Sequence, residues 1–186
     1  MGTTRGDTRR RIQDVALELF ADKGYDKTSL REIAERLDVT KAALYYHFKT
    51  KEDILVSLVE DHFGRVDALI AWGRDQPATL ETRLELLARY SALLAGGSTL
   101  FRFMQENQAS IRELSLGESF KARMGDIIGM LRDKDADLKD QARCISAIFA
   151  MHAGMFALAD APGDAEEKRL ACLEVAQDLV TAAHKG

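Results

Sequence analysis

Proline and cysteine are both scarce in this chain of 186 residues, and each scarcity narrows the folds that it can adopt. Only two prolines interrupt a sequence rich in alanine, leucine, glutamate, aspartate and arginine, which favours an all-α fold. The two cysteines, Cys144 and Cys172, lie in apolar stretches without the paired spacing of a metal site or a disulfide framework. We therefore expect buried thiols in a reducing compartment.

Long apolar runs are missing as well. Residues 1–11 are polar and basic with no apolar run behind them, so no secretory signal is expected. The most apolar stretch, residues 144–159, is shorter than the roughly 18 apolar residues of a membrane span. These absences predict a cytoplasmic protein that has no membrane partner.

The net charge of −4 is divided unevenly along the chain. Residues 1–51 hold eleven Lys and Arg against eight Asp and Glu, whereas the other 135 residues hold 15 against 22. A weakly basic N-terminal part on an acidic remainder indicates that only the N-terminal part contacts a polyanion. The acidic remainder disfavours a non-specific architectural DNA binder.

Two short helices with a turn at Asp38 and Val39 are predicted between residues 28 and 51. Ser29 opens the first helix, because Ser followed three residues later by Glu32 is a capping box. The apolar residues of this helix recur at the spacing of one helical face: Leu30, Ile33, Ala34 and Leu37.

The second helix of this pair has a polar outer face. Leu44 and Phe48 point inward, and no carboxylate lies between Lys41 and Lys51. The remaining side chains are basic, aromatic or small: Lys41, Ala42, Tyr45, Tyr46, His47, Lys49 and Lys51. A helix-turn-helix whose second helix is exposed and basic is suited to the major groove of DNA.

The residues of the same stretch also match the sequence pattern of a known protein family. Its matching positions are Gly24, Tyr25, Thr28–Arg31, Ile33, Ala34, Val39–Lys41, Leu44–Phe48, Lys51 and Glu52. This pattern resembles the DNA-binding domain of the TetR family of bacterial transcription regulators, over about Arg9 to Leu58. Asp38 and Ala42 depart from it, since the family often has glycine at both positions. Aspartate tolerates the left-handed backbone of a tight turn better than most residues do.

The resemblance implies which residues contact DNA. Five of them would face the groove and read bases: Thr40, Lys41, Ala42, Ala43 and Tyr45. Six others would hold phosphates: Thr28, Ser29, Arg31, Tyr46, His47 and Lys51. Lys41 can donate to guanine O6 and N7, and the Ala43 methyl group can pack on a thymine methyl group.

Some of these residues have an alternative structural role. Tyr45 and Tyr46 could instead pack on the first helix of the chain, and His47 could be a cap between the second helix of the pair and the helix that follows it, with or without a phosphate contact. The N-terminal arginines are either a solvated terminus or further phosphate contacts: Arg5, Arg9, Arg10 and Arg11. The residues alone leave these alternatives open.

The remaining breaks and capping signals predict about nine helices in all. The first, over Thr8–Lys23, ends at Gly24, and residues 1–50 would form the helix-turn-helix DNA-binding domain. A long helix over Thr50–Trp72 opens a C-terminal helical domain of residues 51–186, which the resemblance implies is used for effector binding and dimerisation. The other helices are predicted over Thr79–Leu94, Thr99–Asn107, Leu116–Arg132 (with Ser115 and Glu118 as a capping box), Asp137–Asp160 and Asp164–His184.

Residues 144–159 are apolar nearly all round a helix and must therefore be covered on every side. We expect one face to pack inward on the chain itself: Ile145, Phe149, His152 and Phe156. The opposite face has small residues that permit the close approach of a partner helix. The predicted dimer interface, shared with the last helix, is Ala147, Met151, Gly154, Leu158, Leu170, Leu173 and Val180. The resemblance implies the same state, a homodimer joined by four helices.

A small apolar or amphipathic effector is expected to bind in the C-terminal domain. The candidate pocket residues are mostly large and apolar: Trp72, Tyr90, Phe101, Phe103, Met104, Met124, Ile127, Ile128, Phe149, His152, Met155 and Phe156. For each of them, ordinary core packing is the alternative.

No catalytic arrangement is visible in the sequence. Cys144 and His152 are eight residues apart on one helix, roughly 12 Å along its axis, which is too far for a hydrogen bond. No Ser/His/Asp arrangement, Gly-rich phosphate loop or metal-ligand spacing occurs, so we expect no cofactor, no metal and no enzyme. The sequence predicts a regulator of transcription, a repressor released from a palindromic operator in double-stranded DNA by a small molecule. The alternatives are a ligand-independent regulator or activator and, remotely, an enzyme that uses the C-terminal pocket.

Overall fold

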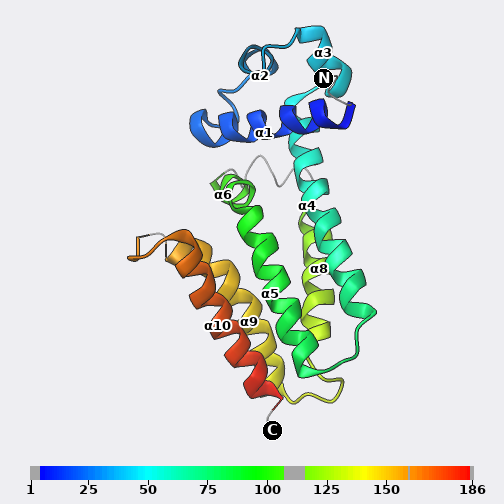
Figure 1. The fold of residues 1–186 in the computed structure, drawn as a ribbon, viewed down its shortest axis with the longest axis vertical. Helices are drawn as coiled ribbons and strands as arrows, with labels where there is room; N and C mark the ends of the chain where they lie inside the picture. The colour runs from blue at the N-terminus through cyan, green and yellow to red at the C-terminus, as the bar shows by residue number, and fades with distance from the viewer. Residues whose placement is uncertain (1–4, 107–115, 159, 185–186) are drawn as a thin grey trace. The chain divides into compact units, whose positions relative to one another are not determined.

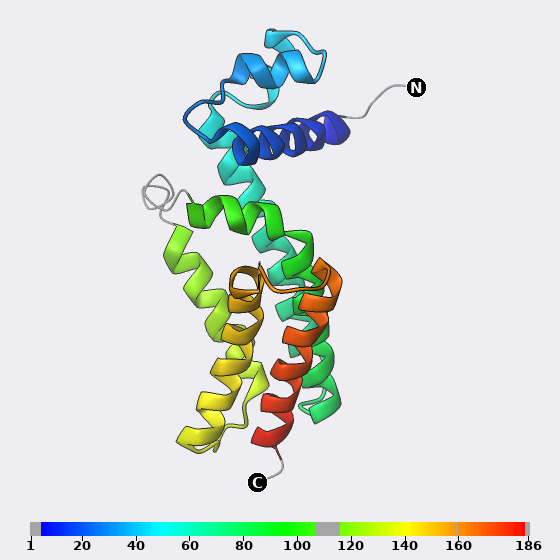
Figure 2. The same ribbon diagram turned by 90° about the vertical axis from the view of Figure 1, so that its left-hand side faces the viewer.

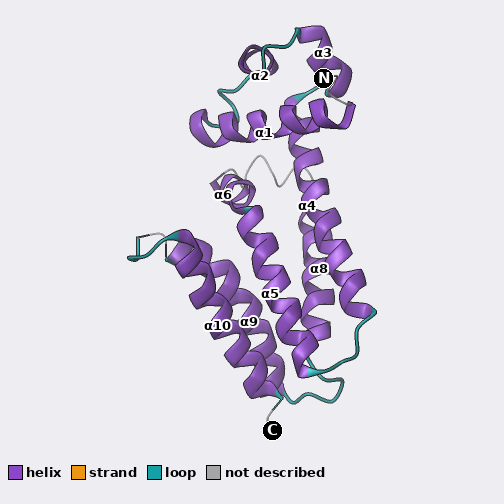
Figure 3. Cartoon of the chain, viewed as in Figure 1, coloured by secondary structure: helices purple, strands orange, loops and turns teal. Residues whose placement is uncertain are grey.

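The computed structural model describes residues 5–106, 116–158 and 160–184. Within these ranges every regular element is an α-helix, which confirms the predicted all-α class (Figure 3). The helices are α1 (Arg5–Lys23), α2 (Leu30–Arg36), α3 (Lys41–His47), α4 (Lys51–Arg74), α5 (Leu80–Gly96), α6 (Ser98–Glu106), α8 (Leu116–Leu131), α9 (Leu138–Ala157) and α10 (Ala165–Ala183) (Figure 1).

The predicted helix boundaries agree with these to within a few residues. Two predicted positions, Asn107 and the capping residue Ser115, lie outside the described residues. Among the described helices, none combines the length and the apolar character that a membrane crossing requires. The same part of the chain brings together no group of three or more His, Cys, Asp or Glu side chains that could hold a metal ion.

The helices gather into two compact units. The N-terminal unit comprises Met1–Phe63 with Thr99–Ser115, and the C-terminal unit comprises Gly64–Ser98 with Leu116–Gly186. The sequence placed the division after residue 50 and assigned the helix at residues 99–107 to the C-terminal part. The structure instead groups α6 with the N-terminal unit, because Phe103 is buried against the aromatic side chains of that unit. The long helix α4 contributes residues to both units.

The N-terminal unit is built around α1. Figure 1 shows α2 and α3 on one side of this helix. The buried apolar side chains of these three helices and of the residues that follow α2 and α3 are Ile12, Ala16, Phe20, Ile33, Ala34, Leu37, Leu44 and Phe48. These include both residues that the sequence placed on the inner face of α3.

Backbone geometry fixes the two turns of this unit. Gly24 ends α1 with φ +89° and donates its N–H to Phe20 O at 3.1 Å, a helix C-cap that favours glycine. Asp38 lies between α2 and α3 with φ 53°, the left-handed conformation in which the family often has glycine. Since aspartate adopts this region at small cost, the departure from the family pattern leaves the turn intact.

The C-terminal unit contains α9 and α10 packed side by side, as both views of the chain show (Figure 2). Three helices of this unit begin with side chains that accept hydrogen bonds from backbone N–H groups: Thr79 for α5, Asp137 for α9 and Asp164 for α10.

Ion pairs join the second half of α4 to α8. Arg123 donates to both carboxylate oxygens of Asp67 at 2.8 Å, and Arg74 lies 3.0 Å from Asp126.

The structure reverses the two faces that the sequence assigned to α9. Four residues predicted to meet a partner chain are buried within this chain instead: Ala147, Met151, Leu173 and Val180. Gly154 and Leu158 are partly buried, and of the predicted set only Leu170 is exposed. Three residues predicted to pack inward are exposed: Ile145, Phe149 and Phe156. The error has a physical cause, because a helix that is apolar all round gives no periodic signal for its inner face.

Close contact between α9 and α10 occurs at Gly154. A Cβ atom at this position would overlap the Cys172 sulfur. The small residues of α9 therefore permit close helix approach, as predicted, but the approaching helix is α10 of the same chain. Of the two cysteines, Cys144 is buried and Cys172 is partly exposed.

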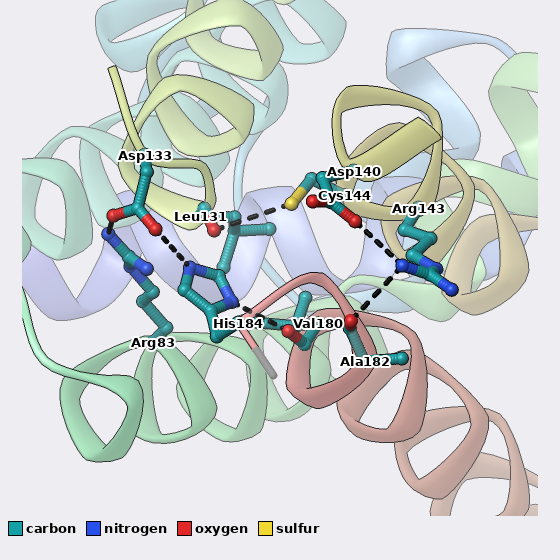
Figure 4. A network of polar contacts seen from close by, with 9 residues as sticks. All are labelled: Arg83, Leu131, Asp133, Asp140, Arg143, Cys144, Val180, Ala182 and His184. Carbon is teal, nitrogen blue, oxygen red and sulfur yellow. Dashed lines mark hydrogen bonds and ion pairs between the residues drawn. The ribbon is translucent and has the colours of Figure 1, made fainter. Parts of the chain in front are cut away.

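A polar cluster ties α5, the α8–α9 connection and the end of α10 (Figure 4). The Arg83 side chain, only 5% exposed, donates to Asp133 Oδ1 at 2.6 Å and holds the pKa of that carboxyl below its usual range. His184, which caps α10, lies with Nε2 3.5 Å from Asp133 Oδ2 and with Nδ1 2.7 Å from Val180 O. One carboxylate thus faces two basic side chains from different helices.

Candidate nucleic-acid interface

The helix α3 is held by a cap at its start and by one buried side chain. Thr40 Oγ1 accepts a hydrogen bond from Ala43 N at 3.2 Å, which satisfies a free N–H group of the first turn. Leu44 is the one buried residue among Lys41–His47. The side chains of Lys41, Ala42 and Ala43 are exposed. The base-reading candidates at the start of the helix therefore face outward, as a groove-binding helix requires.

Three aromatic residues lie in the second half of α3. Tyr46 is 63% exposed, whereas Tyr45 and His47 are partly buried. The Tyr46 and His47 rings meet edge to face with centroids 5.3 Å apart, and the Lys41 ammonium lies 5.6 Å from the Tyr45 ring centroid. Tyr46 thus has the exposure of a phosphate contact rather than of a core residue.

The carbonyl end of α3 has a basic partner that sequence reasoning did not assign. Lys49 Nζ donates to Tyr45 O at 2.7 Å. A cation at this end of a helix is favoured by the helix dipole and satisfies a free carbonyl group. The spacing of four residues between Lys49 and Tyr45 is the signal that the sequence offered for this contact.

Two of the predicted phosphate contacts have structural roles. Thr28 is buried, and its hydroxyl lies within hydrogen-bond distance of Gly24 O at 2.9 Å and Leu19 O at 3.2 Å. Ser29 forms the predicted capping box with Glu32: its Oγ accepts from Glu32 N, and its own N–H donates to Glu32 Oε2 at 2.8 Å. The Ser29 N–H and hydroxyl both donate to the Glu32 carboxylate, and these two hydrogen bonds lower the pKa of Glu32. The Thr28 side chain therefore cannot reach a phosphate without leaving its site.

Arg31 keeps the exposure that a phosphate contact needs. Its guanidinium donates to Glu35 at 2.7 Å on the surface of α2, and this hydrogen bond raises the pKa of Arg31. Because both side chains are largely exposed, the pair is a weak one that an incoming phosphate can replace.

Lys51 is held by Tyr25. Its ammonium donates to Tyr25 O at 2.8 Å and lies 4.2 Å from the centroid of the Tyr25 ring. Burial, followed by the charge of Glu52, raises the pKa of the Tyr25 phenol. The sequence predicted a DNA contact for Lys51 but gave Tyr25 no role beyond its place in the Gly-Tyr pair of the family pattern.

One arginine near the start of α1 also contacts the region after α3. The Arg9 guanidinium lies 4.5 Å from the centroid of the Phe48 ring, and Arg9, Arg10 and Arg11 are all exposed on α1. All four N-terminal arginines thus belong to the helix α1, which begins at Arg5. The side chain of Arg5 lies outside the described residues.

Part of the predicted effector pocket comes together in the C-terminal unit. Tyr90 Oη lies 2.6 Å from His152 Nε2 and 3.2 Å from Met124 Sδ. Burial raises the pKa of Tyr90, so its hydroxyl keeps its proton at neutral pH. Phe120 meets the His152 ring edge to face at 5.9 Å and was not among the predicted residues. This polar pair among sulfur and aromatic groups lies between α5, α8 and α9.

Other predicted pocket residues lie elsewhere. Phe101, Phe103 and Met104 belong to α6 in the N-terminal unit. Phe149 and Phe156 are exposed on α9. The sequence could not assign these five side chains correctly, because neither the grouping of α6 nor the orientation of α9 can be read from local sequence.

The remaining candidate pocket residues differ in their surroundings. Trp72 packs under the Arg89 guanidinium, which lies 4.1 Å from its ring centroid. Ile127 is fully buried and Ile128 is partly buried, so both fit the core-packing alternative. The side chain of Met155 lies outside the described residues.

Comparison with known proteins connects this geometry to a family. Residues 12–58 match the family model described as bacterial regulatory proteins, tetR family. The repressor KstR2 of Rhodococcus jostii (strain RHA1) is 31% identical over 135 residues, which cover 61% of this chain and 65% of that protein. The fatty acid metabolism regulator protein of Bacillus subtilis (strain 168) is 31% identical over 109 residues, 58% of this chain and 52% of that protein. The chain thus spans between half and two thirds of these relatives.

Solved structures share the whole fold. A TetR-like transcriptional regulator from Rhodococcus sp. RHA1 has a TM-score of 0.72 at 16% identity and covers 98% of both chains. AmtR of Mycobacterium smegmatis has a TM-score of 0.71 at 23% identity, over 96% of this chain and 87% of its own. The matched segment contains the capping box, the left-handed turn and the exposed α3 described above. Over residues 12–58 the chain is thus similar to the TetR family of bacterial regulatory proteins, and its fold is that of solved TetR-like regulators.

Proposed function

We propose that this protein is a transcription repressor that binds an operator in double-stranded DNA through α3. The observation that supports this most strongly is the outer face of that helix. It is exposed, free of carboxylates from Lys41 to His47, and held by a cap and one buried leucine. KstR2 carries the name of a repressor, which favours repression over activation here.

The side chains at the interface divide into two groups. Thr40, Lys41, Ala42, Ala43 and Tyr45 form the base-reading group, in which Lys41 donates to guanine and the alanines meet thymine methyl groups. Arg31, Tyr46, His47 and Lys51 form the phosphate-binding group, with Ser29 contributing through the start of α2. We leave Thr28 out of the second group, because its hydroxyl is used inside the unit.

We also propose that the working form is a homodimer joined through α9 and α10. Exposed apolar side chains lie on both of these helices: Ile145, Phe149 and Phe156 on α9, and Leu170 and Val175 on α10. Large apolar side chains gathered on neighbouring helices favour burial against a second apolar surface. A second copy supplies the same surface and gives a symmetric contact, which matches a palindromic operator.

The effector is proposed to bind beside Tyr90 and His152. A small apolar or amphipathic molecule suits the Met124 and Phe120 side chains, and the Tyr90–His152 pair can exchange its internal hydrogen bond for one to a polar group of the ligand. Ligand binding would release DNA only if the ligand prefers the conformation with low DNA affinity, so the coupling must be reciprocal.

Selection of duplexes from a random pool by the full chain tests the DNA-binding role. We expect an enriched motif with twofold symmetry whose half-sites lie about one helical turn apart, roughly 34–36 Å. Enrichment of no motif at low ionic strength would remove the proposal. An enriched motif without twofold symmetry would support DNA binding but contradict binding as a symmetric dimer.

The ligand-released mechanism needs a separate test. Candidate molecules found by thermal-shift screening are titrated into the free protein and into its complex with the selected duplex. A lower affinity of the ligand for the protein–DNA complex than for the free protein supports release of the DNA by the ligand. Equal affinities would favour a ligand-independent regulator.

A further inference from the structure

An aromatic cluster joins α6 to the part of the N-terminal unit that holds Lys51. Phe103 of α6 stacks on Phe20 with ring centroids 5.6 Å apart and lies 5.9 Å from the Tyr25 ring. The Phe20 and Tyr25 rings meet edge to face at 5.0 Å. All three side chains are at most 6% exposed, so the position of each ring depends on the other two.

Tyr25 in turn fixes the ammonium of Lys51 from two directions. The carbonyl of Tyr25 accepts one N–H of the ammonium at 2.8 Å, and the face of its ring lies 4.2 Å away. An ammonium group has three donors, so two remain for a phosphate. The electrostatic attraction between the ammonium and the face of the Tyr25 ring also holds the ammonium at this position.

We propose that Phe103 and Tyr25 are positioning residues for DNA binding, through which α6 holds the Lys51 ammonium at its phosphate. A displacement of α6 would move Phe103, loosen the Tyr25 ring and release Lys51. This inference rests on the proposed function. Gly97 alone separates α5 from α6 in the chain.

The consequence for binding is specific. Phosphate contacts carry no sequence information, so loss of the Lys51 contact weakens binding to all duplexes alike. It also reduces the number of counterions released on binding and flattens the dependence of affinity on salt. A residue that serves only folding would lower the amount of active protein and leave this salt dependence unchanged.

The test measures the affinity of the full chain for the selected duplex over a series of KCl concentrations. We expect Phe103→Leu and Lys51→Ala each to weaken binding about tenfold and to reduce the slope of log affinity against log salt by about one per protomer. In the double variant F103L/K51A, the slope should fall no further than in K51A.

Matched variants separate positioning from general damage. Phe101→Leu removes a neighbouring α6 ring, which meets His62 at 4.9 Å, and should keep the wild-type slope. Tyr25→Phe keeps both the ring and the carbonyl and should also keep the slope, whereas Tyr25→Leu should lose it. If Phe103→Leu fails to fold, the two Tyr25 variants decide.

Two results would overturn the inference: a wild-type slope in Phe103→Leu or Tyr25→Leu, or slope losses in F103L/K51A that simply add. A wild-type protein that binds no duplex would overturn the proposed function instead, and the two failures are therefore distinguishable.

Discussion

Two exposed surfaces of this chain have opposite chemistry. The outer face of α3, opposite the buried Leu44, presents lysine, tyrosine and small side chains, whereas the outer surface of α9 and α10 presents Phe149, Phe156 and Leu170. A basic polar surface is not stabilised much by contact with an apolar surface. An exposed apolar surface is likewise not stabilised much by contact with a polyanion. The contrast fits the two partners proposed above, a duplex for α3 and a second copy of the chain for α9 and α10.

The largest effect is expected from a charge placed on the apolar surface. Phe149, which is 66% exposed on α9, should lie within the proposed dimer interface. Phe149→Glu would bury an unpaired carboxylate and raise the dimer dissociation constant about 100-fold or more. Sedimentation of the variant should give the mass of one chain. Lys121→Glu on the exposed surface of α8 is the charge control, and an unchanged mass for Phe149→Glu would place the partner surface elsewhere.

The inner face of α9 should respond differently. Gly154→Ala would drive a methyl group into the Cys172 sulfur and should destabilise the C-terminal unit by about 2 kcal/mol, which lowers Tm by about 4–8 °C. Calorimetry measures this. Gly125→Ala on α8 has nothing near its new methyl group and should not destabilise. Adding Cys172→Ala to Gly154→Ala should recover part of the loss, and no recovery would contradict the contact.

Base reading by α3 is expected to depend on Lys41. Replacing it with alanine should cost about 1.5 kcal/mol at one guanine of the operator and relax the preference there. Binding to a panel of operator variants reports this change. Lys27→Ala, an exposed lysine before α2, should leave the ranking of the variants unaltered. If Lys41→Ala also leaves the ranking unaltered, Lys41 does not read bases.

The smallest effect concerns the polar cluster of the C-terminal unit, which belongs to neither surface. The Arg83 guanidinium lowers the pKa of Asp133, so this carboxylate adds stability at pH values above its unfolded pKa. That contribution is lost as the pH falls through the lowered folded pKa. Because Asp133 is 59% exposed, the gain is below about 1 kcal/mol.

Chemical unfolding across pH tests this contribution. Asp133→Asn should be less stable than the wild type at neutral pH, and the difference should shrink in acid. Asp135→Asn, an exposed neighbour in the same connection, is the control. A difference that stays constant with pH would remove the ionic contribution.

Local signals in the sequence were sufficient for the N-terminal helices. The capping box of Ser29 and Glu32, the glycine after α1 and the turn at Asp38 all depend on residues close to one another in the chain. The same holds for Thr50 and Asp53, whose reciprocal hydrogen bonds open α4. These interactions need no knowledge of the rest of the fold, and the structure contains each of them.

Non-local packing could not be read in the same way. The orientation of α9 depends on which side α10 covers, and its sequence is apolar on every side. The placement of Phe103 depends on Phe20, more than eighty positions away in the chain. The role of Thr28 was missed because a hydroxyl that donates to backbone carbonyls has the same sequence pattern as one that faces a phosphate.

Interference by guanine methylation tests most directly whether α3 enters the major groove. Dimethyl sulfate methylates guanine N7, which lies in that groove, so modified copies of the selected duplex report which guanines the protein needs. We predict two clusters of interfering guanines about one helical turn apart, with one guanine per half-site losing its effect in Lys41→Ala. Binding that is indifferent to methylation at every guanine of the site would contradict the account.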